Sequence, residues 1–224
     1  MYDPPEALGL TDRSTNEEIR KAAFDFAHDV GYMMFATITE DGQTPTSRGI
    51  EVHYLDDEGN LYIGISKGKP FYDEILKHPY VTGAIARLTS GRLSISVRIS
   101  ARVKPVDDPK LMERYWELNP GTKSLYRKDL ENFKLFILEK GDGEIFHVPF
   151  PDSVARVRFG FGGESPRPWR YNIADNCTGC GQCVNICLTG VLTVEGGKAV
   201  IHHRGCLECG KCYDSCPNGA VQKK

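Results

Sequence analysis

The sequence CTGCGQCVNICLTG at residues 177–190 is followed, after a short insert, by CLECGKCYDSCPNG at residues 206–219. Each stretch places four cysteines in the order Cys-x-x-Cys-x-x-Cys-x-x-x-Cys, and the second repeats the first with a constant offset of 29 residues, from Cys177 to Cys206. Together the two stretches contain all eight cysteines of the 224-residue chain. No cysteine is left for another role, so the chemistry of this tail guides the interpretation of the remaining sequence.

Iron–sulfur ligation accounts for this spacing. Four thiolates hold a 4Fe–4S cluster, and in bacterial ferredoxins with two clusters the fourth cysteine of each run ligates the cluster of the other run. The spacing therefore predicts one cluster bound by Cys177, Cys180, Cys183 and Cys216, and a second bound by Cys206, Cys209, Cys212 and Cys187. Over about 50 residues this part of the chain resembles a two-cluster ferredoxin, which implies electron transfer.

Two other interpretations of the cysteines agree less well with the sequence. A disulfide framework is typical of short secreted proteins, and this sequence shows no apolar signal peptide. Structural zinc sites are usually built from two Cys-x-x-Cys pairs and not from two runs of four cysteines. One departure from the ferredoxin pattern is Leu188 after Cys187, where the second run has Pro217. Because that proline is not a ligand, we expect a small local change and no loss of a cluster.

Composition narrows the class of protein. Hydrophobic residues make up 40% of the chain, which is enough for a core, and the formal net charge of −2 gives no footprint for nucleic-acid binding. No apolar run approaches the roughly 18–20 residues of a membrane span. With every cysteine committed to the tail, we expect a cytoplasmic protein with no nucleic-acid partner and no membrane span.

Residues 1–158 predict a mainly β, α+β domain. An irregular arm is expected at residues 1–14, followed by a helix that Ser14 or Thr15 caps and Gly31 ends. Turn residues at 40–42 and 56–60 separate alternating apolar segments, which is typical of antiparallel hairpins. Strands are predicted at residues 32–39, 46–55, 61–65, 80–88, 93–105, 133–139 and 144–148, and further helices at residues 71–77 and 108–119. Many antiparallel strands with a few short helices indicate a small barrel.

A Gly- and Pro-rich segment separates the two parts of the chain. Residues 159–170 (FGFGGESPRPWR) are predicted as a linker, with Trp169 as a packing anchor. The remaining residues 171–224 form the predicted α+β ferredoxin domain, in which a hairpin lies between the two cysteine runs. From Tyr171 onward the basic residues exceed the acidic ones by one. This is less acidic than a free carrier ferredoxin usually is, and it indicates a module that mainly serves its own chain.

The order of elements in residues 15–150 resembles the FMN-binding split barrel of the pyridoxamine 5′-phosphate oxidase-like superfamily. The segments that carry the resemblance are RGIEVH at residues 48–53, LYIGISKGK at residues 61–69, a helix that ends at His78-Pro79, and VRISARV at residues 97–103. The resemblance implies a homodimer with FMN at the dimer interface.

The resemblance also implies which residues bind the flavin. Arg48 is expected to bind the FMN phosphate together with a loop that follows the next strand, and guanidinium, ammonium and hydroxyl donors suit a dianionic phosphate. His53 stands where the vitamin B6 oxidases carry a lysine that also reaches the phosphate. Backbone of residues 49–51 and 64–65 is expected to border the flavin ring. The expected flavin-site residues are Arg48, Gly49, Ile50, Glu51, His53, Gly64, Ile65, Ser66, Lys67 and Lys69. The substrate-phosphate residues of true pyridoxamine phosphate oxidases are not found, and no catalytic acid or base can be named.

Flavin is a natural partner for iron–sulfur clusters, because clusters move single electrons and flavin can collect two and release them as hydride. The sequence therefore predicts an iron–sulfur flavoprotein oxidoreductase that passes electrons between two 4Fe–4S clusters and FMN, with a small molecule or a protein as redox partner. Three alternatives stay open. The chain is an electron-carrier subunit of a larger complex, or its barrel holds deazaflavin or haem in place of FMN, or its flavin serves only storage or sensing.

Overall fold

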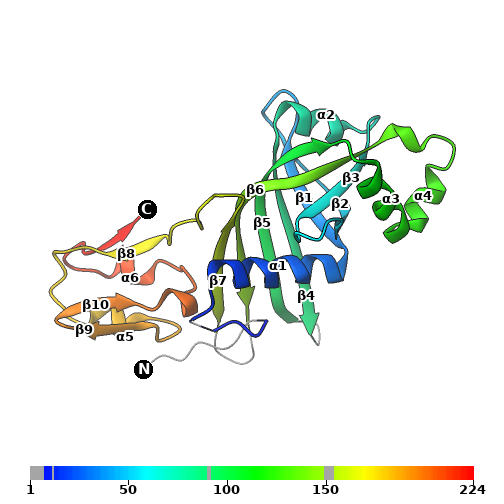
Figure 1. Cartoon of the computed structure of the whole chain (residues 1–224). Coiled ribbons are helices and arrows are strands. Elements are labelled where there is room, and N and C mark those ends of the chain that lie inside the picture. Colours follow the sequence, from blue (N-terminus) through cyan, green and yellow to red (C-terminus); the bar gives the residue numbers. More distant parts are fainter. Residues whose placement is uncertain (1–7, 12, 90–91, 149–153) are drawn as a thin grey trace.

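The computed structural model describes residues 8–11, 13–89, 92–148 and 154–224, so most of the predicted N-terminal arm lies outside the described residues. A β-barrel occupies the N-terminal part of the chain, and a smaller cysteine-rich C-terminal domain lies at one end of it (Figure 1). The barrel strands are β1 (Tyr32–Ile38), β2 (Pro45–Tyr54), β3 (Leu61–Ser66), β4 (Tyr80–Thr89), β5 (Arg92–Val106), β6 (Phe133–His147) and β7 (Ala155–Phe161). The helices of this part are α1 (Asn16–Val30), α2 (Pro70–Lys77), α3 (Pro109–Leu118), α4 (Pro120–Leu125) and the 3₁₀ turn η1 (Leu130–Asn132).

Six antiparallel strands close the barrel. The strand order is β3-β2-β1-β4-β5-β6-β7, and an additional pairing of β3 with β6 completes the ring. β6 pairs with two strands along the edge that does not face β5. Its first part pairs with β3, and its second part, Gly141–His147, pairs with β7. The predicted mainly β barrel with short helices is confirmed.

The prediction of two separate strands at residues 133–139 and 144–148 is wrong, since β6 runs unbroken through both. The sequence Gly141-Asp142-Gly143 between them has the composition of a turn, but the two glycines serve close packing. A Cβ atom on Gly143 would lie 2.7 Å from the backbone oxygen of Arg98, and one on Gly141 would meet the backbone of Ser100. Glycine at these positions lets β6 pass close to β5 without leaving the sheet.

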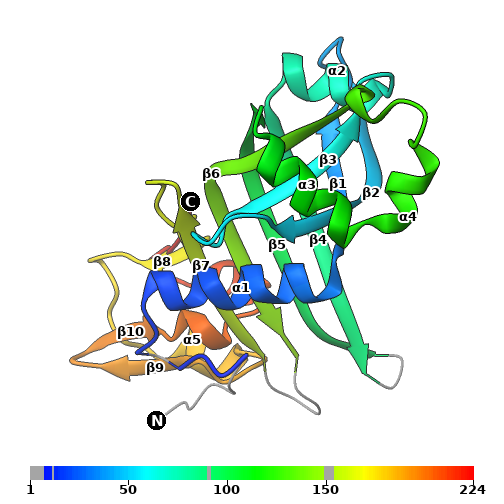
Figure 2. The same cartoon turned by 45° about the vertical axis from the view of Figure 1, so that its right-hand side comes forward.

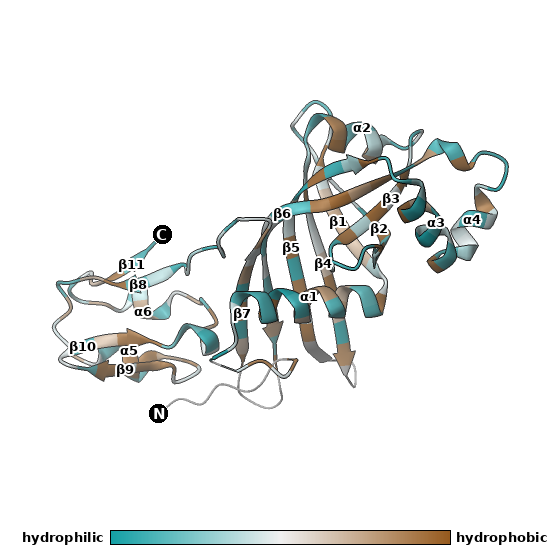
Figure 3. Ribbon diagram, in the orientation of Figure 1, coloured by the Kyte–Doolittle hydropathy of each residue, from teal (hydrophilic) through white to brown (hydrophobic). Residues whose placement is uncertain are grey.

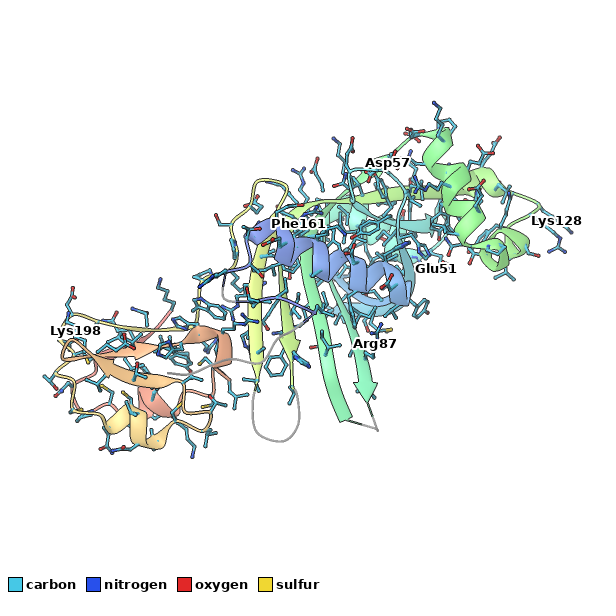
Figure 4. All side chains as sticks on the ribbon, turned by 60° about the horizontal axis from the view of Figure 1, so that its bottom comes forward. Glu51, Asp57, Arg87, Lys128, Phe161 and Lys198 are labelled. Carbon is cyan, nitrogen blue, oxygen red and sulfur yellow. The ribbon has the colours of Figure 1, made fainter. Side chains whose placement is uncertain are left out.

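Helix α1 closes one side of the barrel (Figure 2). Thr15, one of the two predicted caps, begins it, and Glu18 completes a capping box. Gly31 ends it, as predicted, in the left-handed conformation with φ of 72°. The Phe24 ring of α1 packs edge-on against Phe159 and Phe161 of β7, at 6.0 and 5.1 Å between ring centroids. Figure 4 shows Phe161 beside one end of this helix. β7 was not predicted, and it extends to Phe161, so the first three residues of the predicted linker belong to the barrel.

A second apolar cluster joins α3 to the barrel. It contains Leu55, Tyr62, Tyr115, Trp116, Phe133 and Leu135. β3 is buried along its whole length because α3 and η1 cover the face that the barrel core does not. Figure 3 shows β3 and the first part of β6 as mainly hydrophobic, whereas the visible side of α1 is mainly hydrophilic.

The C-terminal domain contains two small antiparallel sheets and two short helices. Its elements are β8 (Tyr171–Ile173), α5 (Gln182–Ile186), β9 (Leu192–Glu195), β10 (Lys198–Ile201), the 3₁₀ turn η2 (His203–Gly205), α6 (Lys211–Asp214) and β11 (Val221–Lys223). β9 pairs with β10, which is the predicted hairpin between the two cysteine runs. β11 returns to pair with β8, so the start and the end of the domain lie side by side.

Candidate functional site

Two pockets in the C-terminal domain are each lined by four cysteines. One is lined by Cys177, Cys180, Cys183 and Cys216, and the other by Cys187, Cys206, Cys209 and Cys212. Each pocket thus combines three neighbouring cysteines of one run with the last cysteine of the other run. Among the described residues, no group of three or more His, Cys, Asp or Glu side chains is placed to hold a single metal ion.

Backbone amides point at several of the sulfur atoms. The N–H of Glu208 donates to Cys206 Sγ at 3.3 Å, that of Ala199 to Cys177 Sγ at 3.4 Å, and that of Ala220 to Cys216 Sγ at 3.2 Å. Amide donors of this kind stabilise thiolate and tune the potential of a bound cluster. The donor set of each pocket therefore fits a 4Fe–4S cluster.

Burial opposes the ionisation of several of the cysteine thiols. It raises the pKa of Cys183 and Cys206, and it raises the pKa of Cys212 to about 11. For Cys216, burial opposes ionisation, but backbone N–H groups outweigh it and lower the pKa. Because cluster ligands are thiolates, cluster insertion at Cys183, Cys206 and Cys212 must displace protons.

A buried ion-pair network connects the C-terminal domain to the barrel. Glu208, in the second cysteine run, accepts from Arg158 of β7 at 2.7 Å and lies 3.5 Å from Arg156. On the barrel side, Arg158 and Arg156 both pair with Glu144 of β6 at 2.8 Å. Burial opposes ionisation of Glu144, but Arg158, Arg156 and Arg98 outweigh it and hold its pKa below the usual value. The sequence interpretation assigned no role to these residues, because the partners are far apart along the chain.

Trp169 packs in this interface, as the sequence predicted for a packing anchor. Its ring stacks on His203 at 5.0 Å and 3° between planes, and the Arg158 guanidinium lies 4.2 Å from its centroid on the barrel side. An arginine above an aromatic face adds a cation–π attraction to the ion pairs. The linker is therefore anchored between the two domains.

Arg48, the expected phosphate ligand, already has an internal partner. Its guanidinium lies 3.0 Å from the buried Glu74 carboxylate of α2 and 4.6 Å from the centroid of Phe71. Phe71 lies two residues after Lys69, so the structure brings Arg48 next to the expected phosphate loop. An incoming phosphate would have to share this arginine with Glu74.

The loop after β3 is partly exposed. Lys67 and Lys69 are exposed, and Lys67 Nζ donates to the backbone oxygen of Glu131 at 2.9 Å. Ser66 is buried and accepts from Asn132 Nδ2 at 3.3 Å. The two lysines are thus accessible to an anion, while the hydroxyl of Ser66 is occupied within the chain.

The remaining expected flavin residues lie on different faces of β2 and β3. Ile50 points into the barrel core, whereas Glu51 accepts from Tyr115 and Thr122 at 3.1 and 2.6 Å beneath α3 and α4. His53 donates through Nε2 to Asn119 Oδ1 at 3.1 Å, on the same face as Glu51. Successive residues of a strand face opposite sides, and Arg48 and His53 are five positions apart, so the structure does not bring His53 to Arg48.

Two glycines of the expected flavin site are covered by aromatic rings. The Tyr32 ring lies on Gly49, and that tyrosine is 55% exposed. Gly64 faces the Tyr115 and Phe133 rings, with a Cβ position 2.7 Å from Phe133 Cε1, and Ile65 is buried. Within one chain, the Gly49 side of the site is accessible and the Gly64–Ile65 side is not.

An open cleft of about 760 Å³ lies on the outer face of β1, β4, β5 and β6. A neighbouring cleft shares Thr82, Ser100 and Asp142 with it and reaches Glu208 at the domain interface. The volume of the first cleft is in the range of small-molecule sites. Neither cleft is lined by any of the ten expected flavin residues.

None of the helices in the described ranges is long and apolar enough to cross a membrane.

Comparison with known structures identifies the barrel fold. A NimC/NimA family protein from Clostridium acetobutylicum superimposes with a TM-score of 0.52 at 23% sequence identity, over 63% of this chain and 91% of that one. The protein Atu2129 from Agrobacterium tumefaciens, of unknown function, superimposes with a TM-score of 0.50 at 16% identity, over 62% of this chain and 61% of its own. At these identities the likeness concerns the fold alone, and the predicted split barrel is confirmed.

Comparison of sequences identifies the C-terminal domain. Residues 165–221 match the family model of the 4Fe-4S dicluster domain. An uncharacterized ferredoxin of Methanocaldococcus jannaschii is 46% identical over 44 residues, which are 19% of this chain and 71% of that ferredoxin. A ferredoxin of Methanothermococcus thermolithotrophicus is 38% identical over 53 residues, 22% of this chain and 88% of its own. Through this domain, carried behind a split β-barrel, the chain belongs to the family of 4Fe–4S dicluster ferredoxins.

Proposed function

We propose that this protein is an iron–sulfur flavoprotein in which single electrons pass between two 4Fe–4S clusters in the C-terminal domain and FMN bound to the barrel. The observation that carries the proposal is the pair of four-cysteine pockets in a domain joined to a split barrel by buried ion pairs. A carrier that serves many partners has no need of such a connection to one barrel.

The clusters would be held as the pockets group the cysteines. Cys177, Cys180, Cys183 and Cys216 would bind one cluster, and Cys206, Cys209, Cys212 and Cys187 the other. The protein supplies thiolate ligands, amide donors to sulfur and a fixed position relative to the barrel.

For FMN, the residues that fit are those at the start of α2. Lys67 and Lys69 are exposed, and Arg48 presents a partly exposed guanidinium beside them, which suits a phosphate. When bound, the flavin supplies the exchange between one-electron and two-electron transfer. The covered positions Gly64 and Ile65 are not proposed as ring contacts.

An exposed apolar surface supports the proposed homodimer. Tyr32, Met34 and Tyr80 are 55%, 49% and 65% exposed on the outer face of β1 and β4. Tyr32 and Met34 lie next to Gly49, and Tyr80 lies toward the other end of β1. Exposed aromatic and methionine side chains of this kind are enriched at protein interfaces. A second copy of the chain would cover this face and enclose a ligand that rests on Gly49.

Cofactor analysis after anaerobic purification tests the proposal. The cluster ligation rule predicts about eight irons and eight acid-labile sulfides per chain, and the flavin proposal predicts about one released FMN. Zinc in place of iron would overturn the cluster proposal. A Soret band or a released deazaflavin would overturn the FMN proposal while leaving the clusters in place.

Substitution of the last cysteine in each run tests the ligand assignment. In Cys187→Ser, the electron paramagnetic resonance signal of the cluster at Cys206, Cys209 and Cys212 is expected to change, although Cys187 lies next in sequence to the other cluster. Cys216→Ser is the matched control, with the opposite expectation. If each variant instead damages the cluster of its own run, the crossed assignment is wrong.

A further inference from the structure

The internal repeat of the C-terminal domain is broken at Glu208. With the offset of 29 residues, Glu208 corresponds to Gly179, and both lie two residues after the first cysteine of their run. Both residues adopt the left-handed conformation, with φ of 66° at Gly179 and 54° at Glu208. Glycine adopts this conformation freely, whereas a residue with a β-carbon is strained in it. The second run therefore keeps a glutamate where the turn favours glycine.

A strained residue persists when the surrounding structure determines its position, and such residues cluster at functional sites. The Glu208 carboxylate lies 2.7 Å from Arg158 and accepts from the backbone N–H of Arg170 at 2.8 Å. Its side chain is only 13% exposed, and that of Arg158 only 8%. The side chain of Glu208 thus contacts the barrel and the linker.

The backbone of the same residue contacts a cluster ligand. The N–H of Glu208 donates to Cys206 Sγ at 3.3 Å, and Glu208 lines the pocket formed by Cys187, Cys206, Cys209 and Cys212. One residue therefore connects the sulfur atoms of the second pocket to Arg158 of β7. The turn η2, which precedes Cys206, also packs on β7.

The first pocket lies on the other side of the domain. Gly179 packs under the backbone of Gly197, at the β9–β10 turn, and Lys198 pairs with Asp175 at 2.9 Å. Figure 4 shows Lys198 at the end of the domain that is far from the barrel. Cys180 of this pocket and Cys209 of the other are both exposed to solvent, so the difference between the pockets lies in their contacts with the barrel and not in exposure. The two pockets thus differ in their relation to the barrel.

We propose that Glu208 is a positioning residue that fixes the pocket of Cys187, Cys206, Cys209 and Cys212 against the barrel. The cluster held there would exchange single electrons with the FMN proposed on the barrel. The cluster of Cys177, Cys180, Cys183 and Cys216 would exchange them with an external one-electron protein of the ferredoxin class. Each transfer moves one electron, oxidising one centre as it reduces the next, and the order reverses when the net flow reverses. The electron-exchange part rests on the proposed function, whereas the positioning part depends only on the clusters.

The test replaces Glu208 in two ways. Glu208→Gly restores the residue that the first run uses at this turn, so the domain is expected to fold and to bind both clusters. Glu208→Gln keeps the side-chain shape and removes its charge. Asp214→Asn is the matched control, because Asp214 lies in the same run, is exposed, and forms no ion pair with the barrel.

Two measurements on the holoprotein decide the positioning role without reference to flavin. In hydrogen-exchange measurements, the backbone amides of β7 and of residues 203–210 are expected to exchange faster in both Glu208 variants than in the wild type. In Asp214→Asn they are expected to exchange at the wild-type rate. In a redox titration followed by electron paramagnetic resonance, loss of the carboxylate is expected to raise the midpoint potential of one cluster only. Cys180→Ser and Cys209→Ser identify that cluster, since each perturbs a different pocket. Unchanged protection at β7, or equal shifts of both clusters, would overturn the proposal.

A third measurement applies to the flavin-loaded protein. Single-turnover transfer between clusters and flavin is expected to slow in Glu208→Gly and to stay unchanged in Asp214→Asn. If no flavin is found, the proposed function fails, and the exchange and potential measurements still decide the role of Glu208. If flavin is present and its reduction does not change in Glu208→Gly, the assignment of the barrel-facing cluster is wrong.

Discussion

His53 shows how burial makes one side chain sensitive to pH. Burial lowers its pKa, and the hydrogen bond with Asn119 offsets only part of that effect. An unfolded histidine titrates near 6.5, so below that pH the unfolded state binds a proton that the native state does not. The free energy of unfolding should therefore fall as pH is lowered from about 7.5 to 5.5. His203, whose pKa burial also lowers, acts in the same direction.

In His53→Gln, the difference between the melting temperatures at these two pH values should be smaller than in the wild type. Circular dichroism under anaerobic conditions measures it. His78→Gln is the control, because that ring is partly exposed and its hydrogen bond is with the backbone oxygen of Glu40. If both variants reduce the pH dependence of the melting temperature equally, that dependence does not come from His53.

Gly64 is a glycine whose missing side chain is required by packing. A β-carbon there would lie 2.7 Å from Phe133 Cε1 and would also meet the buried Tyr115 ring. Overpacking of a buried site typically costs about 1–3 kcal/mol. We therefore expect Gly64→Ala to lower the free energy of unfolding in urea by about that amount. Gly68→Ala, in the adjoining loop with open space around it, should stay within roughly 0.5 kcal/mol of the wild type. Similar effects of the two substitutions would contradict this account of Gly64.

At the scale of elements, a buried carboxylate on β6 pairs with arginines of β5 and β7. Glu144 is 9% exposed and accepts from Arg158, Arg156 and Arg98. Removing one partner of a buried pair costs about 3–5 kcal/mol, because the remaining charges stay uncompensated. Glu144→Gln should lose stability of that order in urea denaturation. Glu139→Gln, on the same strand with an exposed Lys104 partner, should lose about 0–1 kcal/mol.

The same carboxylate predicts an acid-sensitive barrel. The native pKa of Glu144 lies below the unfolded value of about 4.3, so its contribution is complete above that value and is lost as pH falls through the native pKa. The wild type should lose stability more steeply than Glu144→Gln below about pH 5. Parallel curves would show that other carboxylates dominate.

Local signals in the sequence identified most elements, and the exceptions have physical reasons. The Thr15–Glu18 capping box and the β9–β10 hairpin depend on residues within one or two turns of each other, so composition predicts them. The glycines of β6 look like a turn until β5 is placed against them. β7 is held by pairing with β6 and by Phe24 of α1, which no local pattern reveals.

At the scale of the whole molecule, the difference between local sequence signals and contacts from distant elements also separates the cysteine pockets from the expected flavin site. The crossed grouping of the cysteines was predictable because the spacing encodes it, and the pockets group them in that way. The Glu74 partner of Arg48 and the Tyr115 ring over Gly64 come from other elements, α2 and α3, so the sequence could not show what else contacts the expected flavin residues. Besides Trp169, a local sign of the domain interface is a glutamate at a turn position that holds glycine in the first run.

Removal of the clusters should separate the two domains in stability. The main barrel core contains no residue beyond Phe161 among the described residues, whereas the core of the C-terminal domain is small and includes Cys183, with four more cysteines packed against it. A small domain built around metal ligands usually unfolds without its metal. After iron is removed with an oxidant and a chelator, the barrel should keep its β-sheet circular dichroism while the C-terminal domain unfolds. The melting temperature of the barrel should nevertheless fall, because Arg158 and Arg156 then lose Glu208 as a partner.

The fall should be about 2–4 °C for each kcal/mol lost. Glu208→Gly provides the control, since its barrel lacks the carboxylate before and after cluster removal and should show no further fall. Equal falls in the wild type and in Glu208→Gly would mean that the clusters stabilise the barrel by a route other than this ion pair. Loss of the barrel signal together with the clusters would mean that the two domains fold as one unit.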